Sequence, residues 1–205
     1  LGTTYYWRVD EVNNVNIVPV WEGNVWQFST QEYFVVEDFE DYNDYPPDEV
    51  WNTWIDGYGV ATNGSTAGYP DPNFLDEEHY VETGTVHSGE QSMPLLYDNT
   101  GNVNNSEVTR TFDTAQDWTR AGINTLVLYV YGQADNAGGQ FYVKVNGIEK
   151  AVDVDLTSES WQELKIELGS FGVNLQRVTS LAISIRGAGS GMVFIDDILV
   201  GAPLE

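Results

Sequence analysis

Acidic residues concentrate in two stretches near opposite ends of the sequence. Residues 35–41 read Val-Val-Glu-Asp-Phe-Glu-Asp, and residues 192–200 read Met-Val-Phe-Ile-Asp-Asp-Ile-Leu-Val. Both stretches read as strands, and the second is apolar on both faces, which is typical of an interior strand of a packed sheet. If the two strands lie side by side, up to six carboxylates converge with no basic residue nearby in the sequence. Calcium, a hard cation that takes oxygen ligands, would relieve that repulsion.

Catalytic motifs are missing from the sequence. Neither His79 nor His87 stands in a recognisable nucleophile context, and no HExxH, phosphate-loop or dinucleotide-binding motif occurs. Paired carboxylates could support glycoside hydrolysis, but with 32 acidic residues some pairs arise by chance. The sequence therefore predicts a non-catalytic protein.

Three short motifs carry a resemblance to a known family. Phe39-Glu40, the segment Ser-Gly-Glu-Gln-Ser at 88–92 and the segment Phe-Ile-Asp-Asp-Ile at 194–198 look like the signposts of calcium-containing β-jelly-roll carbohydrate-binding modules. The resemblance covers roughly residues 33–203, and the chain is also similar to modules of large secreted proteins from planctomycete-like bacteria. It implies a jelly-roll fold, glycan binding without catalysis and a structural calcium ion.

The resemblance also implies ligands for that ion. Glu40 and Asp197 match positions whose side chains coordinate calcium in such modules. The turn at 88–92 would add backbone carbonyls together with the Gln91 side chain, for a total of about six to eight oxygens. Flanking acids leave the register open, so the remaining candidate ligands are Ser88, Asp196, Asp38 and Glu37.

Aromatic side chains offer two candidate platforms for a sugar, whose C–H faces need exposed rings beside fixed polar groups. The first is a loop group of Trp51, Trp54, Asp56 and Tyr58, with Tyr97, Asp98 and Asn99 opposite. The second is a strand group of Tyr129, Tyr131, Tyr142, Lys144 and Arg186, if its strands share one sheet. The loop group is favoured, because two tryptophans in an irregular segment have little structural reason to be there. The alternatives are that Trp54 and Tyr58 pin the loop to the domain and that another sheet or the N-terminal hairpin covers the tyrosines.

Short strands separated by turns must position these residues. We predict strands at residues 91–97, 106–112, 125–131, 140–145, 148–154, 161–168, 180–186 and 192–200. Asn146-Gly147 is a type I′ hairpin signal, and one helical turn is expected at 115–121 with Asp117 as its cap. The long irregular segment 41–86 is rich in proline, glycine and aromatic residues, so we expect it to be ordered and functional. This pattern predicts an all-β fold, a two-sheet β-sandwich of the jelly-roll type.

Residues 1–30 form a separate unit in this interpretation, and residues 31–205 form the jelly-roll domain. The first segment resembles the last two strands of a fibronectin type III-like domain, with Tyr5 at the corner position and a loop holding Val18, Pro19 and Trp21. Because an isolated hairpin is marginal in water, we expect Trp7, Trp26 and Phe28 to dock on the following domain or on another copy.

Composition limits the partners. The formal net charge of −24 excludes nucleic acid, disfavours anionic membranes and argues for a neutral glycan. The sequence contains no cysteine and no apolar run of membrane-spanning length, so membrane insertion is not expected. Its acidic, lysine-poor composition suits a secreted or cell-surface part of a longer protein. The alternative function is a structural or adhesive module that self-associates through the N-terminal hairpin.

Overall fold

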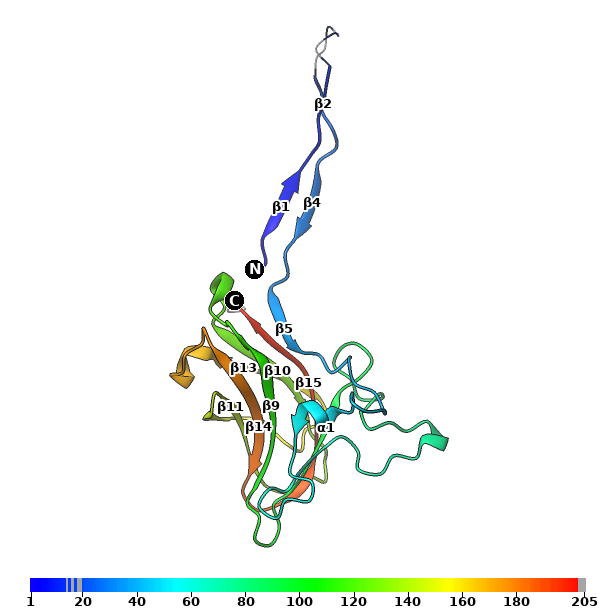
Figure 1. Cartoon of the computed structure of the whole chain (residues 1–205), viewed down its shortest axis with the longest axis vertical. Coiled ribbons are helices and arrows are strands. Elements are labelled where there is room, and N and C mark those ends of the chain that lie inside the picture. The colour runs from blue at the N-terminus through cyan, green and yellow to red at the C-terminus, as the bar shows by residue number, and fades with distance from the viewer. Residues whose placement is uncertain (14, 16, 18–19, 203–205) are drawn as a thin grey trace.

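Two antiparallel β-sheets packed face to face form the body of the protein, and a narrow hairpin projects from one end (Figure 1). The computed structural model describes residues 1–13, 15, 17 and 20–202. The predicted all-β sandwich is confirmed. In the described part of the chain the longest α-helix, α1 (Val50–Thr53), has four residues, and no helix there could span a bilayer.

The six-stranded sheet has the strand order β13–β10–β15–β8–β7, with β5 also paired to β15. Its strands are β5 (Tyr33–Glu37), β7 (Ser65–Ala67), β8 (Met93–Asp98), β10 (Thr125–Tyr131), β13 (Trp161–Glu167) and β15 (Ser190–Gly201). β10 pairs with one edge of β15. The other edge pairs first with β8 and then with β5. The first and last strands of the domain therefore lie side by side, which is the condition that the calcium hypothesis requires.

The five-stranded sheet has the strand order β12–β11–β14–β9–β6. Its strands are β6 (Trp54–Ile55), β9 (Asn105–Gln116), β11 (Gln140–Val145), β12 (Ile148–Val152) and β14 (Val178–Arg186). The hairpin of β11 and β12 turns at Asn146-Gly147, where both residues have positive φ. The predicted type I′ signal thus marks a real hairpin.

The core forms between the two sheets from side chains that alternate along each strand. Leu126, Leu128 and Val130 of β10 are buried, as predicted from their two-residue period. The same holds for residues 141, 143 and 145 of β11 and for residues 181, 183 and 185 of β14.

Short 3₁₀ helices lie outside the sheets at Phe74–Asp76, Arg120–Gly122 and Leu168–Phe171. The helical turn expected at 115–121 was wrong, because β9 runs on to Gln116 and the 3₁₀ turn begins only at Arg120. Asp117 accepts a hydrogen bond from the backbone N–H of Thr119 at 3.0 Å, so it caps a tighter turn than expected.

The N-terminal hairpin consists of β1 (Thr4–Trp7), β2 (Glu11–Val12), β3 (Val20–Trp21) and β4 (Trp26–Ser29). It points away from the sandwich (Figure 1). Tyr5 stacks on Phe28 across the strands, and Trp7 stacks on Trp26. All four rings stay at least half exposed, and Trp26 is 58% exposed. The expected docking of these rings on the following domain is therefore wrong, and their docking on another copy stays a prediction. Val18 and Pro19 lie outside the described residues.

Candidate functional site

The predicted calcium ligands lie where β15 changes partners. Ile195 pairs with the first residue of β8, and Ile198 pairs with the last residue of β5. Asp196 and Asp197 fall in the gap between those partners. Asp197 has a φ of 45°, at a register shift between β10 and β15. This bulge turns both carboxylates toward the segment that precedes β8.

Donors from that segment satisfy both carboxylates. Asp196, which is fully buried, accepts hydrogen bonds from the backbone N–H groups of His87 at 2.8 Å and Ser88 at 3.3 Å. Asp197 accepts one from the Ser88 hydroxyl at 2.9 Å, and its second oxygen lies 2.6 Å from Nδ1 of His87. Burial raises the pKa of Asp196 to about 6, assisted by the charge of Asp197 and opposed by the backbone donors.

Glu40 closes the other side of the same turn. One carboxylate oxygen accepts the backbone N–H groups of Glu90 at 2.9 Å and Gln91 at 3.0 Å. The Gln91 side chain donates back to the backbone carbonyls of Glu40 and Tyr42, each at 3.2 Å. Gly89 is required here, because a Cβ would lie 2.2 Å from the Glu40 carboxylate.

These side chains do not form a calcium cage as they lie. Glu40, Asp196 and Asp197 point oxygens at N–H and O–H donors, and Asp38 accepts the backbone N–H of Glu40 at 3.4 Å. Among the described residues, no three acidic or histidine side chains are placed to hold a metal ion. The structure thus brings Glu40, Asp196 and Asp197 to the turn that holds Ser88 and Gln91, and within its described part it shows no hydrogen bond between Asp38 and that turn. Calcium binding by these residues stays a prediction.

Glu37 has a role that the sequence did not reveal. Its buried carboxylate accepts hydrogen bonds from the backbone N–H of Phe39 at 3.0 Å, from the Tyr42 hydroxyl at 2.6 Å and from the Trp54 indole at 3.0 Å. It also forms an ion pair with Arg110 of β9. One carboxylate therefore ties the start of the long loop to both sheets. Trp54 is completely buried by this contact, so its prediction as a sugar platform was wrong.

The rest of the loop group lines a cleft at the edge of the sandwich. Trp51, Asp56 and Tyr58 meet Thr66 and Ala67 of β7 around a volume of about 420 Å³, which Tyr69, Pro70 and Tyr80 complete. Trp51 packs edge-on against Tyr80 with the ring centroids 4.4 Å apart. Asp56 is fixed by accepting the backbone N–H groups of Tyr58 at 2.9 Å and Ala67 at 2.8 Å. Sequence analysis identified three of these residues and missed Tyr69 and Tyr80.

Residues 97–99 do not face this cleft, contrary to expectation. Tyr97 is buried in the core, with its hydroxyl directed at the backbone carbonyl of Gly138 at 3.3 Å. Asn99 is also buried, where it donates to the Ile185 carbonyl at 2.8 Å. Asp98 caps its own turn through Thr100. Tyr97 and Asn99 position the end of β8 and offer no open surface to a ligand, whereas Asp98 is exposed but does not line the cleft.

The predicted strand group divides between the two sheets. Tyr129 and Tyr131 belong to β10 in the six-stranded sheet, whereas Tyr142, Lys144 and Arg186 belong to the five-stranded sheet. The Tyr129 ring stacks on His87 at 3.5 Å, and the Tyr131 ring packs against Trp161. Side chains of the protein thus cover part of both rings, and the single platform expected from the sequence does not exist.

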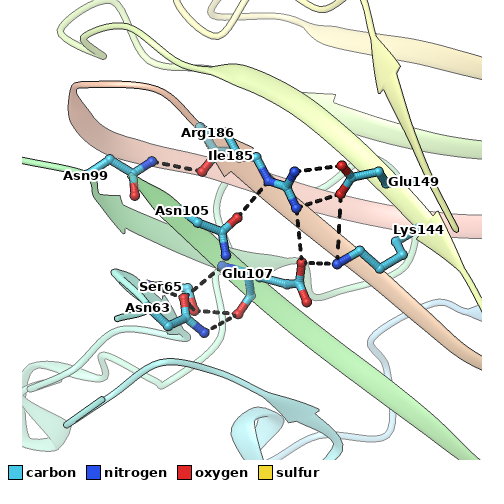
Figure 2. A network of polar contacts seen from close by, with 9 residues as sticks. All are labelled: Asn63, Ser65, Asn99, Asn105, Glu107, Lys144, Glu149, Ile185 and Arg186. Carbon is cyan, nitrogen blue, oxygen red and sulfur yellow. Dashed lines mark hydrogen bonds and ion pairs between the residues drawn. The ribbon is translucent and has the colours of Figure 1, made fainter. Parts of the chain in front are cut away.

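A charge network occupies the outer face of the five-stranded sheet (Figure 2). Lys144 contacts Glu107 at 2.6 Å, and Arg186 contacts Glu149 at 2.5 Å and the Asn105 side chain at 3.0 Å. The Arg186 guanidinium also lies 5.0 Å above the ring of Tyr142. Each base on this face is paired with an acid, so the face presents polar groups with little net charge.

Comparison with known proteins identifies the fold. No family model matches the chain, and no curated protein matches it in sequence. An exo-β-agarase aligns with a TM-score of 0.56 and 14% identity over 85% of this chain, which spans 25% of that enzyme. A family 11 carbohydrate-binding module from Clostridium thermocellum, in complex with a β-1,3-1,4-mixed-linked tetrasaccharide, aligns with a TM-score of 0.46 and 14% identity over 75% of this chain and 96% of that module. TmCBM61 in complex with β-1,4-galactotriose aligns with a TM-score of 0.45 and 17% identity over 85% of this chain and all of that module (100%). At these identities the shared property is the β-sandwich fold.

Proposed function

We propose that this chain is a non-catalytic carbohydrate-binding module of a secreted or cell-surface protein, and that its ligand occupies the cleft at the edge of the sandwich. The observation that carries the proposal is the cleft itself, where the rings of Trp51, Tyr58, Tyr69 and Tyr80 surround the fixed carboxylate of Asp56. Aromatic walls bind the C–H faces of a sugar, and a small number of fixed polar groups orient its hydroxyls.

The geometry of the cleft suits a sugar in size and rigidity. Its volume of about 420 Å³ lies within the range of small-molecule sites, roughly 300–1,000 Å³. Contact with Tyr80 holds Trp51 in place, so binding does not have to order that ring. Tyr58 is 76% exposed and is free to close over a bound ring.

Similar folds occur within proteins that act on or bind polysaccharides. The exo-β-agarase contains such a domain as a quarter of its length, and the family 11 module carries an oligosaccharide in its structure. These activities belong to those proteins, and the ligand of this chain is a proposal. The net charge of −24 makes anionic glycans poor ligands, which leaves neutral or positively charged ones.

A glycan array probed with labelled protein tests this function, followed by titration of any bound glycan into variants. We expect Trp51→Ala and Tyr58→Ala each to weaken binding by about tenfold, because each removes one stacking surface. Tyr142→Ala is the matched control on the five-stranded sheet and should bind as the wild type does. Loss of binding in the control alone would place the site on that sheet, and an array without any bound glycan would refute the function.

A second function, self-association through the hairpin, is supported by a different observation. The four stacked rings of Tyr5, Trp7, Trp26 and Phe28 form an exposed aromatic face. The segments 2–7 and 23–31 that build it contain no charged residue, although the chain carries a net charge of −24. A second copy can therefore approach this ribbon with less repulsion than it meets elsewhere, and apolar burial would hold the pair together.

Light scattering over a range of protein concentrations tests this second function. We expect a weak dimer that strengthens with added salt, because salt screens repulsion between two acidic protomers. The double variant Trp7→Thr, Trp26→Thr should remain monomeric, whereas Ile55→Thr, which removes an exposed apolar side chain from β6, should not change the dimer. A wild type that is monomeric at every concentration and salt level would refute self-association.

A further inference from the structure

We infer that the edge cleft selects glycans with a free, protonated amino group over neutral glycans of the same backbone. This inference rests on the proposed function and specifies the class of its ligand. Its basis is the contrast in charge between the two polar surfaces of the sandwich, only one of which carries bases to balance its acids.

The cleft and its surroundings carry uncompensated negative charge. Asp56 lines the cleft, and an adjoining hollow of about 520 Å³ shares the walls Tyr69 and Pro70. That hollow adds four carboxylates, namely Asp71, Glu77, Glu78 and Glu82. Neither lysine nor arginine occurs among the described residues that line the two hollows. His79, which lines the second hollow, lies 2.7 Å from the carboxylate of Asp44 through Nδ1.

The hydrogen bonds that fix these carboxylates leave their charge in place. Among the described residues, the donors to Asp56 are the uncharged backbone N–H groups of Tyr58 and Ala67. Glu82 accepts the N–H groups of Gly84 at 2.6 Å and Thr85 at 2.8 Å, and it accepts the hydroxyl of Tyr69. Both oxygens of Asp56 accept one hydrogen bond each, and Oε2 of Glu82 accepts one, so these oxygens keep a second lone pair that can bind an ammonium group. Burial, followed by the hydrogen bond to Glu82 and by the charges of Glu82 and Glu78, raises the pKa of Tyr69, which agrees with a negative field at this wall.

The outer face of the five-stranded sheet is the internal comparison. There Lys144 and Arg186 neutralise Glu107 and Glu149 (Figure 2). Since both surfaces belong to one acidic chain, the difference lies in the local placement of the bases and not in the net charge alone. A surface that leaves its acids unpaired beside aromatic rings is suited to a cation, which gains from the carboxylates and from the ring faces of Trp51 and the tyrosines.

Three β-1,4-linked oligosaccharides of equal length test the inference, because they differ only in the substituent at C2. Cello-oligosaccharide carries a hydroxyl group, its N-acetylglucosamine counterpart an acetamido group and its glucosamine counterpart an ammonium group. Calorimetric titration at mildly acidic pH, where the amines are protonated, should show the ammonium form binding about tenfold more tightly than the hydroxyl form at low salt. The preference should shrink as the salt concentration rises.

Single-residue variants distinguish the effect of the charge in the cleft from the effect of the net charge of the protein. Asp56→Asn should reduce the affinity for the ammonium form to that for the hydroxyl form. Asp153→Asn changes the net charge equally at an exposed residue outside the cleft and should keep the preference. Because Asp56 also holds the loop, Glu78→Gln in the adjoining hollow provides a second variant, and the melting temperature of each variant shows whether it folds.

Each outcome decides between distinct conclusions. Equal or tighter binding of the hydroxyl form would overturn the amino-sugar inference and leave the carbohydrate-binding function intact. Equal loss of the preference in Asp56→Asn and Asp153→Asn would also overturn the inference, since net charge would then explain the preference. If no form binds, and the glycan array is also empty, the proposed function fails together with the inference.

Discussion

Replacement of Glu37 by glutamine should destabilise the protein by about 3 kcal/mol, because the partly buried Arg110 then loses its ion-pair partner. Glutamine has nearly the shape of glutamate, so the change removes the charge and one acceptor without creating a cavity. Its amide nitrogen would replace one of the two carboxylate oxygens, so it would face either the N–H of Phe39 at Oε1 or the donors of Tyr42 and Trp54 at Oε2. Breaking a buried ion pair costs about 3–5 kcal/mol. We expect the lower end because the Arg110 side chain is 23% exposed and can recover some hydration.

Urea unfolding monitored by tryptophan fluorescence measures this loss, since Trp54 lies in the network. Tyr42→Phe removes one hydrogen bond to the same carboxylate and should cost about 1–2 kcal/mol. The double variant Glu37→Gln, Arg110→Gln should recover part of the loss, because it leaves no unpaired charge. A loss below about 1 kcal/mol in Glu37→Gln would refute the view that this carboxylate anchors the loop.

Three further experiments test the remaining conclusions. EDTA should leave the melting temperature unchanged if hydrogen bonds alone satisfy the carboxylates of Glu40, Asp196 and Asp197 at the turn 87–91. A drop of several degrees, with calcium found by elemental analysis, would instead support the calcium site predicted from the sequence. Asp196 has a pKa raised from 3.8 to about 6, so the native state binds its proton more tightly than the unfolded chain does. The stability of the wild type relative to Asp196→Asn is therefore greatest below pH 3.8 and should fall as the pH rises through about 6, which unfolding at several pH values measures; a rise over that range would contradict the assignment. Deletion of residues 1–30 should lower the unfolding free energy by no more than about 1 kcal/mol, since it removes the partly buried Leu1 from the core, whereas the rings of the hairpin do not pack on the sandwich; a larger loss would show that the hairpin itself supports the sandwich.

The sequence predicts the fold well because its strands alternate cleanly. The predicted strand at 125–131 coincides with β10, and the predicted strand at 140–145 coincides with β11. The contact between β5 and β15 was a condition of the calcium hypothesis, and the pairing of Val35 with Leu199 meets it. These features depend on local periodicity, which a sequence displays directly.

The sites were less predictable, because their geometry depends on partners far away in the sequence. The burial of Trp54 follows from Glu37, which lies 17 residues earlier. Tyr129 and Tyr142 have the same strand-like surroundings, and only the sheet topology shows that they lie on different sheets. The carboxylate of Asp197 finds its donors 110 residues away in the turn at His87. The excess of acidic residues indicated that their carboxylates need hydrogen-bond donors or a cation. The sequence could not show whether backbone N–H groups or a metal ion meet that need.

The placement of β5 on β15 also determines how the module responds to a pulling force. The first residue of β5, Tyr33, pairs with Gly201 near the end of β15. A force applied at these two residues therefore pulls on one end of the paired strands and breaks their hydrogen bonds one pair at a time. Strands that open in this way need a lower force than strands whose hydrogen bonds are all sheared together. Opening would reach Glu37 last, and its release would free the loop that builds the cleft. In single-molecule pulling from the two ends of the chain, we expect β5 to detach at low force before the sandwich unfolds. Tension would then lower the affinity of the cleft for a bound glycan.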